Sequence, residues 1–373
     1  MSVTVDVTRL WLDRFRGIAE LDLELGHGLT VFVGANGQGK TTLLEAVSWV
    51  ARCRSFRGVP DQVLVQAGHE QAVVRAEVRH DQRTMLFEAE IKSNGRNRVM
   101  LNKSAVSRRR DLQDLLRVSV FAPDDLELVK GGPAFRRVYL DELLGSLAAR
   151  YDAAAMDYER ILKHRNALLR SNSVDASYAS TLEVFDEQLI NAGSELVRGR
   201  LQLLGKLEGE LREAYASLAS TDTSVECTYE SGWSTDALDG SEDIETLRSQ
   251  LREALHRLRS KERERKLTLV GPHRDDLEIK LGGLGARHYA SQGEQRTLAL
   301  SLRLAGHRVI TDLTGSTPVL LLDDVFSELD ESRAAALVEW LPHGQTFLTT
   351  TGVLPASVTP ELTLRIENGK VCQ

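Results

Sequence analysis

The first hundred residues alternate apolar and polar side chains with a period of two. This period is typical of half-buried β-strands, and it predicts strands over residues 3–7, 21–25 and 72–101. Residues 29–33 instead form an almost continuous apolar run that ends at a glycine. Such a run predicts a strand buried on both faces. The apolar spacing over residues 43–50 predicts a helix directly after it.

The middle of the chain has a different period. Apolar residues recur every three or four positions between Leu147 and Leu258, and no proline interrupts residues 134–271. This spacing predicts three long amphipathic helices with coiled-coil-like seams. The polar segment 220–240, between the second and third helices, is expected to be a loop. The helices are expected to form an arm over residues 143–264, inserted into another domain.

Strand and helix patterns alternate in the last third. Strands are predicted over residues 277–281, 319–322 and 346–348, and helices over residues 294–311 and 331–340. Alternation of strands with helices is typical of an α/β fold with a parallel core sheet. We therefore predict a split α/β domain over residues 1–142 and 265–373, interrupted by the helical arm.

Composition excludes several classes of protein. The chain has 373 residues, 42% of them hydrophobic, and a formal net charge of −7. These values exclude a disordered chain and a uniformly basic nucleic-acid coat, while local basic patches stay open. No apolar run reaches the ~18–20 residues that span a bilayer, and residues 1–6 show no secretory pattern. Cys53, Cys227 and Cys372 are too scattered for a disulfide framework, so a reducing cytoplasm is the expected location.

Candidate chemistry begins directly after the buried strand. The segment fits G-x-x-x-x-G-K-[ST], the pattern of a phosphate-binding loop (P-loop) between a strand and a helix. Its nucleotide-binding candidates are Gly34, Ala35, Asn36, Gly37, Gln38, Gly39, Lys40, Thr41 and Thr42. Lys40 is expected to reach the β- and γ-phosphates of ATP, and the Thr41 hydroxyl to ligate Mg²⁺. The alternative, a glycine-rich surface turn, does not account for the flanking strand and helix.

Two carboxylates follow the apolar run 319–322. We expect Asp323 to join the metal shell through a water molecule, and Asp324 to polarise the attacking water as general base. The alternative is a solvated acidic turn after a core strand. The P-loop elsewhere in the chain argues against that alternative.

A third motif, Ser291-Gln292-Gly293-Glu294-Gln295, stands at the start of a predicted helix. A Ser-x-Gly at a helix start presents a hydroxyl and backbone N–H groups to an anion. Taken alone it fits an ordinary helix cap better. The two aspartates follow it along the chain, and Ser327-Glu328-Leu329-Asp330 comes after them.

In this order the motifs resemble those of ABC-type ATPase heads, and the chain is similar to the RecF family of bacterial recombination mediators. The finer resemblance is carried by Phe15-Arg16, residues 34–41, residues 54–57, residues 121–126, residues 163–169, residues 271–277 and residues 323–330. It implies a P-loop parallel sheet with an antiparallel β lobe and an inserted helical arm. Chromosome-structuring relatives carry much longer coiled coils, which favours the RecF family.

The resemblance also implies an ATP- and Mg²⁺-dependent homodimer that binds DNA. Ser291 and Gly293 of one subunit would close on the nucleotide held by the other subunit, and Asp330 would line the dimer seam. Lys40, Asp324 and Ser291 would act in hydrolysis. The implied task is loading a recombinase on single-stranded or gapped DNA, with a RecR-type partner, in DNA repair, replication restart and SOS induction.

The sequence departs from transporter-type heads in two places, and the second of them, a missing switch His, predicts slow hydrolysis. Those heads carry a Gln in the loop that joins their lobes and a switch His after the last core strand, whereas residues 119–124 lack Gln and residues 349–351 lack His. Candidates for DNA phosphate contacts are Arg96, Arg108, Arg109 and Arg110. Arg54 and Arg57 fit either a nucleotide contact or a surface ion pair.

Three other functions stay open from the sequence. They are a transporter motor subunit, a small-molecule P-loop kinase and a chromosome-organising head. Co-purification with membranes would favour the first, and turnover of a phosphate acceptor the second. The third would be favoured if no RecR-type partner bound the protein.

Overall fold

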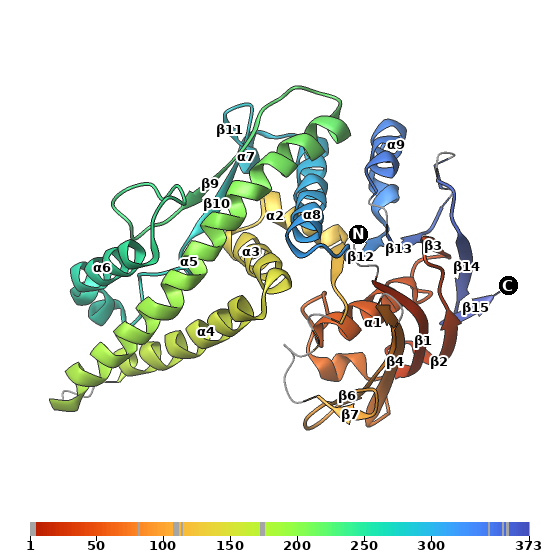
Figure 1. The fold of residues 1–373 in the computed structure, drawn as a ribbon, viewed down its shortest axis with the longest axis horizontal. Helices are drawn as coiled ribbons and strands as arrows, with labels where there is room; N and C mark the ends of the chain where they lie inside the picture. The colour runs from red at the N-terminus through yellow and green to blue at the C-terminus, as the bar shows by residue number, and fades with distance from the viewer. Residues whose placement is uncertain are drawn as a thin grey trace. The chain divides into compact units, whose positions relative to one another are not determined.

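The computed structural model describes residues 5–80, 83–106, 112, 115–171, 176–341, 344–352, 354–355 and 358–372 (Figure 1). The chain divides into two compact units. The first contains residues 1–125, 217–219 and 306–373, and the second contains residues 126–216 and 220–305. The second unit thus holds the expected arm, apart from residues 217–219, together with residues 126–142 and 265–305.

A largely parallel sheet organises the first unit. Its strand order is β15-β14-β3-β13-β12-β8. The strands are β3 (Leu29–Val33), β8 (Val118–Phe121), β12 (Val319–Asp323), β13 (Thr346–Thr350), β14 (Leu362–Glu367) and β15 (Lys370–Cys372). Neighbours run parallel except β15, which is antiparallel to β14. The parallel core sheet predicted from the sequence is confirmed.

An antiparallel sheet forms the other layer of the first unit. Its order is β2-β1-β4-β5-β6-β7. The strands are β1 (Val5–Phe15), β2 (Ile18–Glu24), β4 (Gln71–His80), β5 (Arg83–Lys92), β6 (Arg98–Leu101) and β7 (Ser104–Ala105). Every second side chain of β4, from Ala72 to Val78, is buried. The period-two pattern therefore identified these strands because one face of the sheet is buried.

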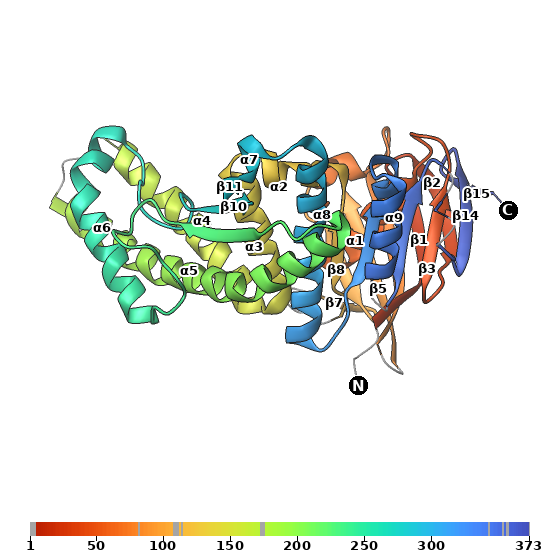
Figure 2. The ribbon, with the colours of Figure 1, turned by 90° about the horizontal axis from the view of Figure 1, so that it is seen from above.

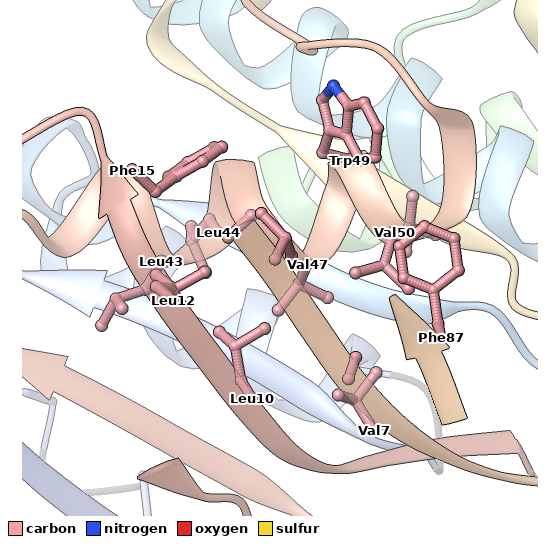
Figure 3. Close-up of a cluster of buried hydrophobic side chains, with 14 of the residues drawn as sticks. Val7, Leu10, Leu12, Phe15, Leu43, Leu44, Val47, Trp49, Val50 and Phe87 are labelled. Atoms are coloured by element: carbon pink, nitrogen blue, oxygen red, sulfur yellow. The ribbon is translucent and has the colours of Figure 1, made fainter. Parts of the chain in front are cut away.

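Helix α1 (Lys40–Arg52) packs between the two sheets of this unit. It contacts β1 and β4 on one side and β8, β12 and β13 on the other. Figure 3 shows the apolar side chains of β1 and α1 gathered in one cluster. The rings of Trp49 and Phe87 meet edge to face there, with centroids 6.3 Å apart. This burial fixes the helix that begins at the P-loop.

The remaining described elements of the first unit are short. They are η1 (Asp61–Leu64), η3 (Pro123–Leu126, which ends at the unit boundary), η4 (Val325–Glu328) and α9 (Glu331–Trp340). A buried amide, Gln345, ties the two sheets together. Its side chain accepts a hydrogen bond from the Val7 N–H and donates to the carbonyl oxygens of Val7 and Gly26.

The second unit combines helices with a small antiparallel sheet (Figures 1 and 2). Its helices are α2 (Glu127–Lys130), α3 (Pro133–Leu147), α4 (Ala149–Arg170), α5 (Ala176–Ala219), α6 (Ile244–Arg265), α7 (Ala286–Tyr289) and α8 (Gln292–Thr314). Helices α5 and α8 end in residues of the first unit. The sheet has the order β11-β10-β9, with β9 (Val225–Glu230), β10 (Asp276–Leu281) and β11 (Leu284–Gly285).

Strand β9 corrects the loop expected over residues 220–240. Val225, Cys227 and Tyr229 are buried while the residues between them are exposed, and the strand pairs with β10 along its whole length. The alternation is therefore present in the sequence. It was hidden because only three apolar residues mark it inside a polar segment.

Buried charges join the long helices of the second unit. Arg165 of α4 donates to Asp186 of α5 and to Glu262 of α6, each at 2.7 Å. Arg200 of α5 binds both carboxylate oxygens of Asp141 at 2.8 Å. Each of these guanidinium groups is buried with its partners in place, so removing one partner would leave a costly unpaired charge. None of the helices in the described ranges is long and apolar enough to cross a membrane.

His307 of α8 is expected to make the first unit sensitive to acid. Its ring is buried, and neither ring nitrogen has a hydrogen-bond partner among the described residues. Burial lowers its pKa from 6.5 to about 4, and the neighbouring charge of Arg308 acts in the same direction. Between these two values the unfolded state binds the proton more strongly, so the free energy of unfolding falls as the pH falls.

His307→Leu should remove this contribution. Urea unfolding at pH 7 and pH 5 should show a loss of stability on acidification that is about 2 kcal/mol smaller in the variant. An unchanged pH dependence would contradict the buried neutral ring. His273, whose pKa burial also lowers to about 4, remains as a second source of acid sensitivity in the second unit.

Candidate functional site

The P-loop connects the end of β3 to the start of α1. Gly37 and Gly39 have φ values of 79° and 105°, in the region that favours glycine. A side chain at Gly34 would collide with the backbone oxygen of Ile366 in β14. The glycines of the motif are therefore required by the path of the backbone as well as by the approach of a phosphate.

Lys40 points back over this loop. Its Nζ donates to the carbonyl oxygens of Gly34 at 2.7 Å and Ala35 at 2.9 Å. Burial lowers the pKa of Lys40, while the nearby charges of Asp324 and Asp323 act to raise it. The loop thus holds a largely buried cation whose contacts are neutral carbonyls, and a phosphate group would compete well for it.

Asp323, at the carboxyl end of β12, accepts hydrogen bonds from two threonines. The Thr41 hydroxyl donates to its Oδ1 at 2.8 Å, with Oδ2 at 3.1 Å, and the Thr349 hydroxyl donates to Oδ1 at 2.7 Å. Asp323 is 7% exposed. Burial raises its pKa, and the two threonine hydroxyls oppose that effect.

These residues fit a bound Mg²⁺. The Thr41 hydroxyl and the Asp323 carboxylate supply hard oxygen atoms from two elements that already touch. A divalent cation would also offset the cost of burying the Asp323 charge, which is the main reason that its pKa is raised.

Asp324 lies beside this pair in a strained conformation. Its φ is 51°, in the left-handed region, and its N–H donates to the Thr349 hydroxyl at 2.9 Å. Its Oδ1 is buried, and within the part of the chain that the structure describes it has no hydrogen-bond partner. A buried carboxylate oxygen without a partner is costly. It is well suited to accept a hydrogen bond from a water molecule at a bound nucleotide.

Thr349 is a candidate site residue that the sequence pattern did not identify. Strand β13 extends to Thr350, so Thr349 lies within the strand and is paired in register with Asp323 of β12. The signal that could have found it is the order of the strands, which places β12 and β13 side by side.

Thr349→Val should therefore impair hydrolysis more than nucleotide binding. The substitution removes a donor to Asp323 and the acceptor of the Asp324 N–H, so Asp324 would lose its position. Misplacing a catalytic group by about 1 Å can cost ~100-fold in rate, and we expect a fall of that order in single-turnover hydrolysis. Thr349→Ser should retain most of the rate, and Thr350→Val serves as the neighbouring control. Equal rates for the two valine variants would contradict this role.

A buried carboxylate, Glu45 of α1, links two of the sequence stretches that carry the family resemblance. Arg16 pairs with it, with Nη2 at 2.7 Å from Oε1, and the Ser55 hydroxyl donates to the same oxygen. Ser55 in turn accepts the Arg57 N–H at 3.1 Å. The turn that carries Arg57 is thus anchored to the P-loop helix, and the positive charge of Arg57 acts to lower the pKa of Asp323.

The turn between β14 and β15 supports the P-loop from the other side. The Asn368 N–H donates to Gln38 Oε1 at 2.6 Å, and the Gly369 N–H donates to the Gln38 backbone oxygen at 3.0 Å. These bonds hold the middle of the loop in place. The structure therefore brings Lys40, Thr41, Asp323 and Asp324 together within the first unit.

Ser291 and Gly293 belong to the second unit. Ser291 immediately precedes α8 and forms a reciprocal capping box with Glu294. Its hydroxyl and its N–H both contact Glu294 Oε2 at 2.7 Å, and the Glu294 N–H donates back to the hydroxyl at 3.4 Å. The Gln295 amide donates to the Arg287 oxygen at 3.2 Å, which anchors the turn that precedes the helix.

The other sequence candidates lie at the surface or outside the described residues. Asp330, in the first unit, caps α9 by accepting the Arg333 N–H at 2.9 Å. Arg96 is exposed in the segment between β5 and β6. Arg108, Arg109 and Arg110 lie outside the described residues.

Comparison with known proteins gives consistent matches over almost the whole chain. The family model described as the RecF/RecN/SMC N terminal domain matches residues 6–351. The DNA replication and repair protein RecF of Frankia alni is 43% identical, and the alignment covers 96% of both chains. The protein of the same name from Streptomyces avermitilis is 42% identical, with 93% of both chains covered.

Solved structures show the same fold. The structure of the recombination mediator protein RecF with ATP, in the RecFOR pathway, has a TM-score of 0.90 and 30% sequence identity, and the match covers 100% of this chain and 98% of that one. An Smc head bound to the C-winged helix domain of ScpA has a TM-score of 0.56 at 15% identity, covering 98% and 95%. This second likeness concerns the fold alone.

Proposed function

The chain belongs to the RecF family, and from that premise we propose that it is an ATP-gated DNA-binding recombination mediator. The observation that carries the proposal is the contact of Thr41 with Asp323, next to Lys40 and the P-loop. Thr41 and Asp323 are 282 positions apart in the sequence but touch in the fold, which supports the proposal of one phosphate and metal site. A relative of the same fold has been solved with ATP.

Each residue of the site has a separate task in this proposal. Lys40 exchanges its two loop carbonyls for the β- and γ-phosphates, and the P-loop N–H groups hold the remaining phosphate oxygens. Thr41 and, through a water molecule, Asp323 would hold Mg²⁺, which neutralises phosphate charge when bound. Asp324 accepts a hydrogen bond from the attacking water through its unpartnered oxygen.

Hydrolysis is proposed to be slow and to release the DNA that the dimer holds. Residues 349–351 contain no histidine, whereas transporter-type heads carry a switch His after the last core strand, so the site has one group fewer to stabilise the γ-phosphate. The protein would act as a weak, DNA-dependent ATPase whose nucleotide state sets its assembly.

The protein is proposed to form an ATP-dependent homodimer in which each nucleotide site is shared between the two subunits. Ser291 and Gly293 of one subunit would close on the nucleotide in its partner, and Asp330 would line the seam. The dimer would hold single-stranded or gapped DNA, with Arg96, Arg108, Arg109 and Arg110 as candidate phosphate contacts. It would work in the cytoplasm with a RecR-type partner to load a recombinase, supporting repair, replication restart and SOS induction.

A chromosome-organising head is the second candidate. The Smc heads share the fold at 15–16% identity, and that likeness concerns the fold alone. A transporter motor subunit is a third candidate, which co-purification with membranes would favour. Binding of a RecR-type partner, rather than a chromosome-organising one, would separate the first two.

Sedimentation velocity tests the proposal directly. The protein is measured without nucleotide, with ADP and with ATP, each with and without gapped DNA and a RecR-type partner. We expect the mass of the particle to double with ATP and to increase further with DNA. An unchanged particle in all conditions would overturn the proposed ATP gate.

A further inference from the structure

Glu294 occupies the groups of Ser291 that an ATP γ-phosphate would need. In the capping box, the Ser291 hydroxyl donates to Glu294 Oε2 at 2.7 Å, and the Ser291 N–H donates to the same oxygen at 2.7 Å. A hydroxyl donates one hydrogen bond at a time. Ser291 can therefore contact a γ-phosphate as a donor only by releasing this carboxylate.

Charge repulsion opposes the replacement of the Glu294 carboxylate by a γ-phosphate at the Ser291 hydroxyl. A terminal phosphate carries about −1.5 to −2 charges near neutral pH, and the carboxylate of Glu294 is also an anion. Both would face the same hydroxyl at the start of α8. The helix dipole favours one negative group there, but two such groups within a few ångströms repel each other.

We infer that Glu294 acts as a built-in competitor of the γ-phosphate for Ser291 and so weakens ATP-dependent closure of the dimer. The inference rests on the proposed function, since it concerns the same shared site. It makes Glu294 a positioning residue with two effects. It holds the turn before α8 in a defined geometry without nucleotide, and it sets a threshold that closure must overcome.

Two structural details support a stable competing state. The Glu294 N–H donates back to the Ser291 hydroxyl at 3.4 Å, so the box is closed in both directions. Gln295, one residue on, fixes the backbone of the preceding turn through the Arg287 oxygen. The serine is thus presented from a turn that Gln295 also anchors.

Glu294→Gln tests the inference because glutamine preserves a capping box while removing the charge. We expect ATP-dependent dimerisation of this variant at a lower protein concentration, by about fivefold for each site, from relief of one like-charge pair at about 4 Å in water. Sedimentation velocity with ATP, with ADP and without nucleotide provides the measurement. The gain should appear with ATP only, since ADP has no γ-phosphate.

Glu245→Gln is the matched control, because Glu245 is an acidic residue in the first turn of α6 and lies outside the proposed site. It should dimerise like the wild type. Glu294→Met is a second variant, which removes both the charge and the hydrogen-bond acceptor. It should also dimerise with ATP at a lower protein concentration than the wild type. Thermal unfolding verifies that each variant folds.

The outcomes separate this inference from the proposed function. If the wild type forms no ATP-dependent dimer, the proposed function fails. If the wild type dimerises with ATP and Glu294→Gln does so equally or less well, the competing role of Glu294 is wrong. A gain that is equal with ADP and ATP would also overturn it.

Discussion

Replacing Asp324 with asparagine should leave ATP bound and nearly stop its hydrolysis. The variant keeps the size of the side chain and the N–H bond to Thr349, but it loses the carboxylate that would receive the proton of the attacking water. A positioned general base contributes typically 10²–10⁴-fold to a rate. We expect a decrease in that range in single-turnover hydrolysis, together with a dimer that persists after ATP is added.

Asp323→Asn is the informative comparison for this experiment. Asp323 accepts hydrogen bonds from Thr41 and Thr349 and would hold the metal, so its loss should weaken nucleotide binding and prevent the dimer from forming. In sedimentation velocity with ATP, Asp324→Asn should therefore remain a dimer, whereas Asp323→Asn should remain a monomer. Hydrolysis at the wild-type rate in Asp324→Asn would remove Asp324 from the role of base.

Local patterns identified the parts of the candidate site that are contiguous in sequence. The P-loop could be found because its glycines, lysine and threonine have a fixed spacing, and the strand and helix around it have clear periods. Asp323 and Asp324 could be found because a buried strand ends at them. The parallel sheet was predictable for the same reason, since each strand and helix carries its own pattern.

The residues that were missed depend on which elements become neighbours. Thr349 joins the site only because β13 lies beside β12 in a register that pairs it with Asp323. Glu45 joins Arg16 to Ser55 only because α1 packs against the end of β1. The local hydrophobic period of a segment reveals neither the order of the strands in a sheet nor the packing of the helices. Glu294 is different, because Ser-x-x-Glu is a capping-box pattern that the sequence alone displays.

Mixing two inactive variants should restore activity if the site is shared between subunits. Lys40→Ala removes the cation that the P-loop presents to the phosphates, and Ser291→Arg blocks the signature serine. Each variant alone should fail to dimerise in the presence of ATP, because both sites of its homodimer lack one half. In a mixed dimer one site lacks both halves and the other is intact. Random assortment of equal amounts should therefore restore about a quarter of the sites, as two-fold symmetry requires.

The readout is ATP-dependent association, with hydrolysis as a second measure in case both sites must act together. Lys40→Ala mixed with wild type gives the reference for partial occupancy, and each variant's thermal unfolding shows that it is folded. The structure places Lys40 in the first unit and Ser291 in the second, so the two substitutions affect separate compact parts of the chain. If mixing restores neither association nor hydrolysis, Ser291 does not act across the dimer. Its contacts with Glu294 would then be those of an ordinary helix cap.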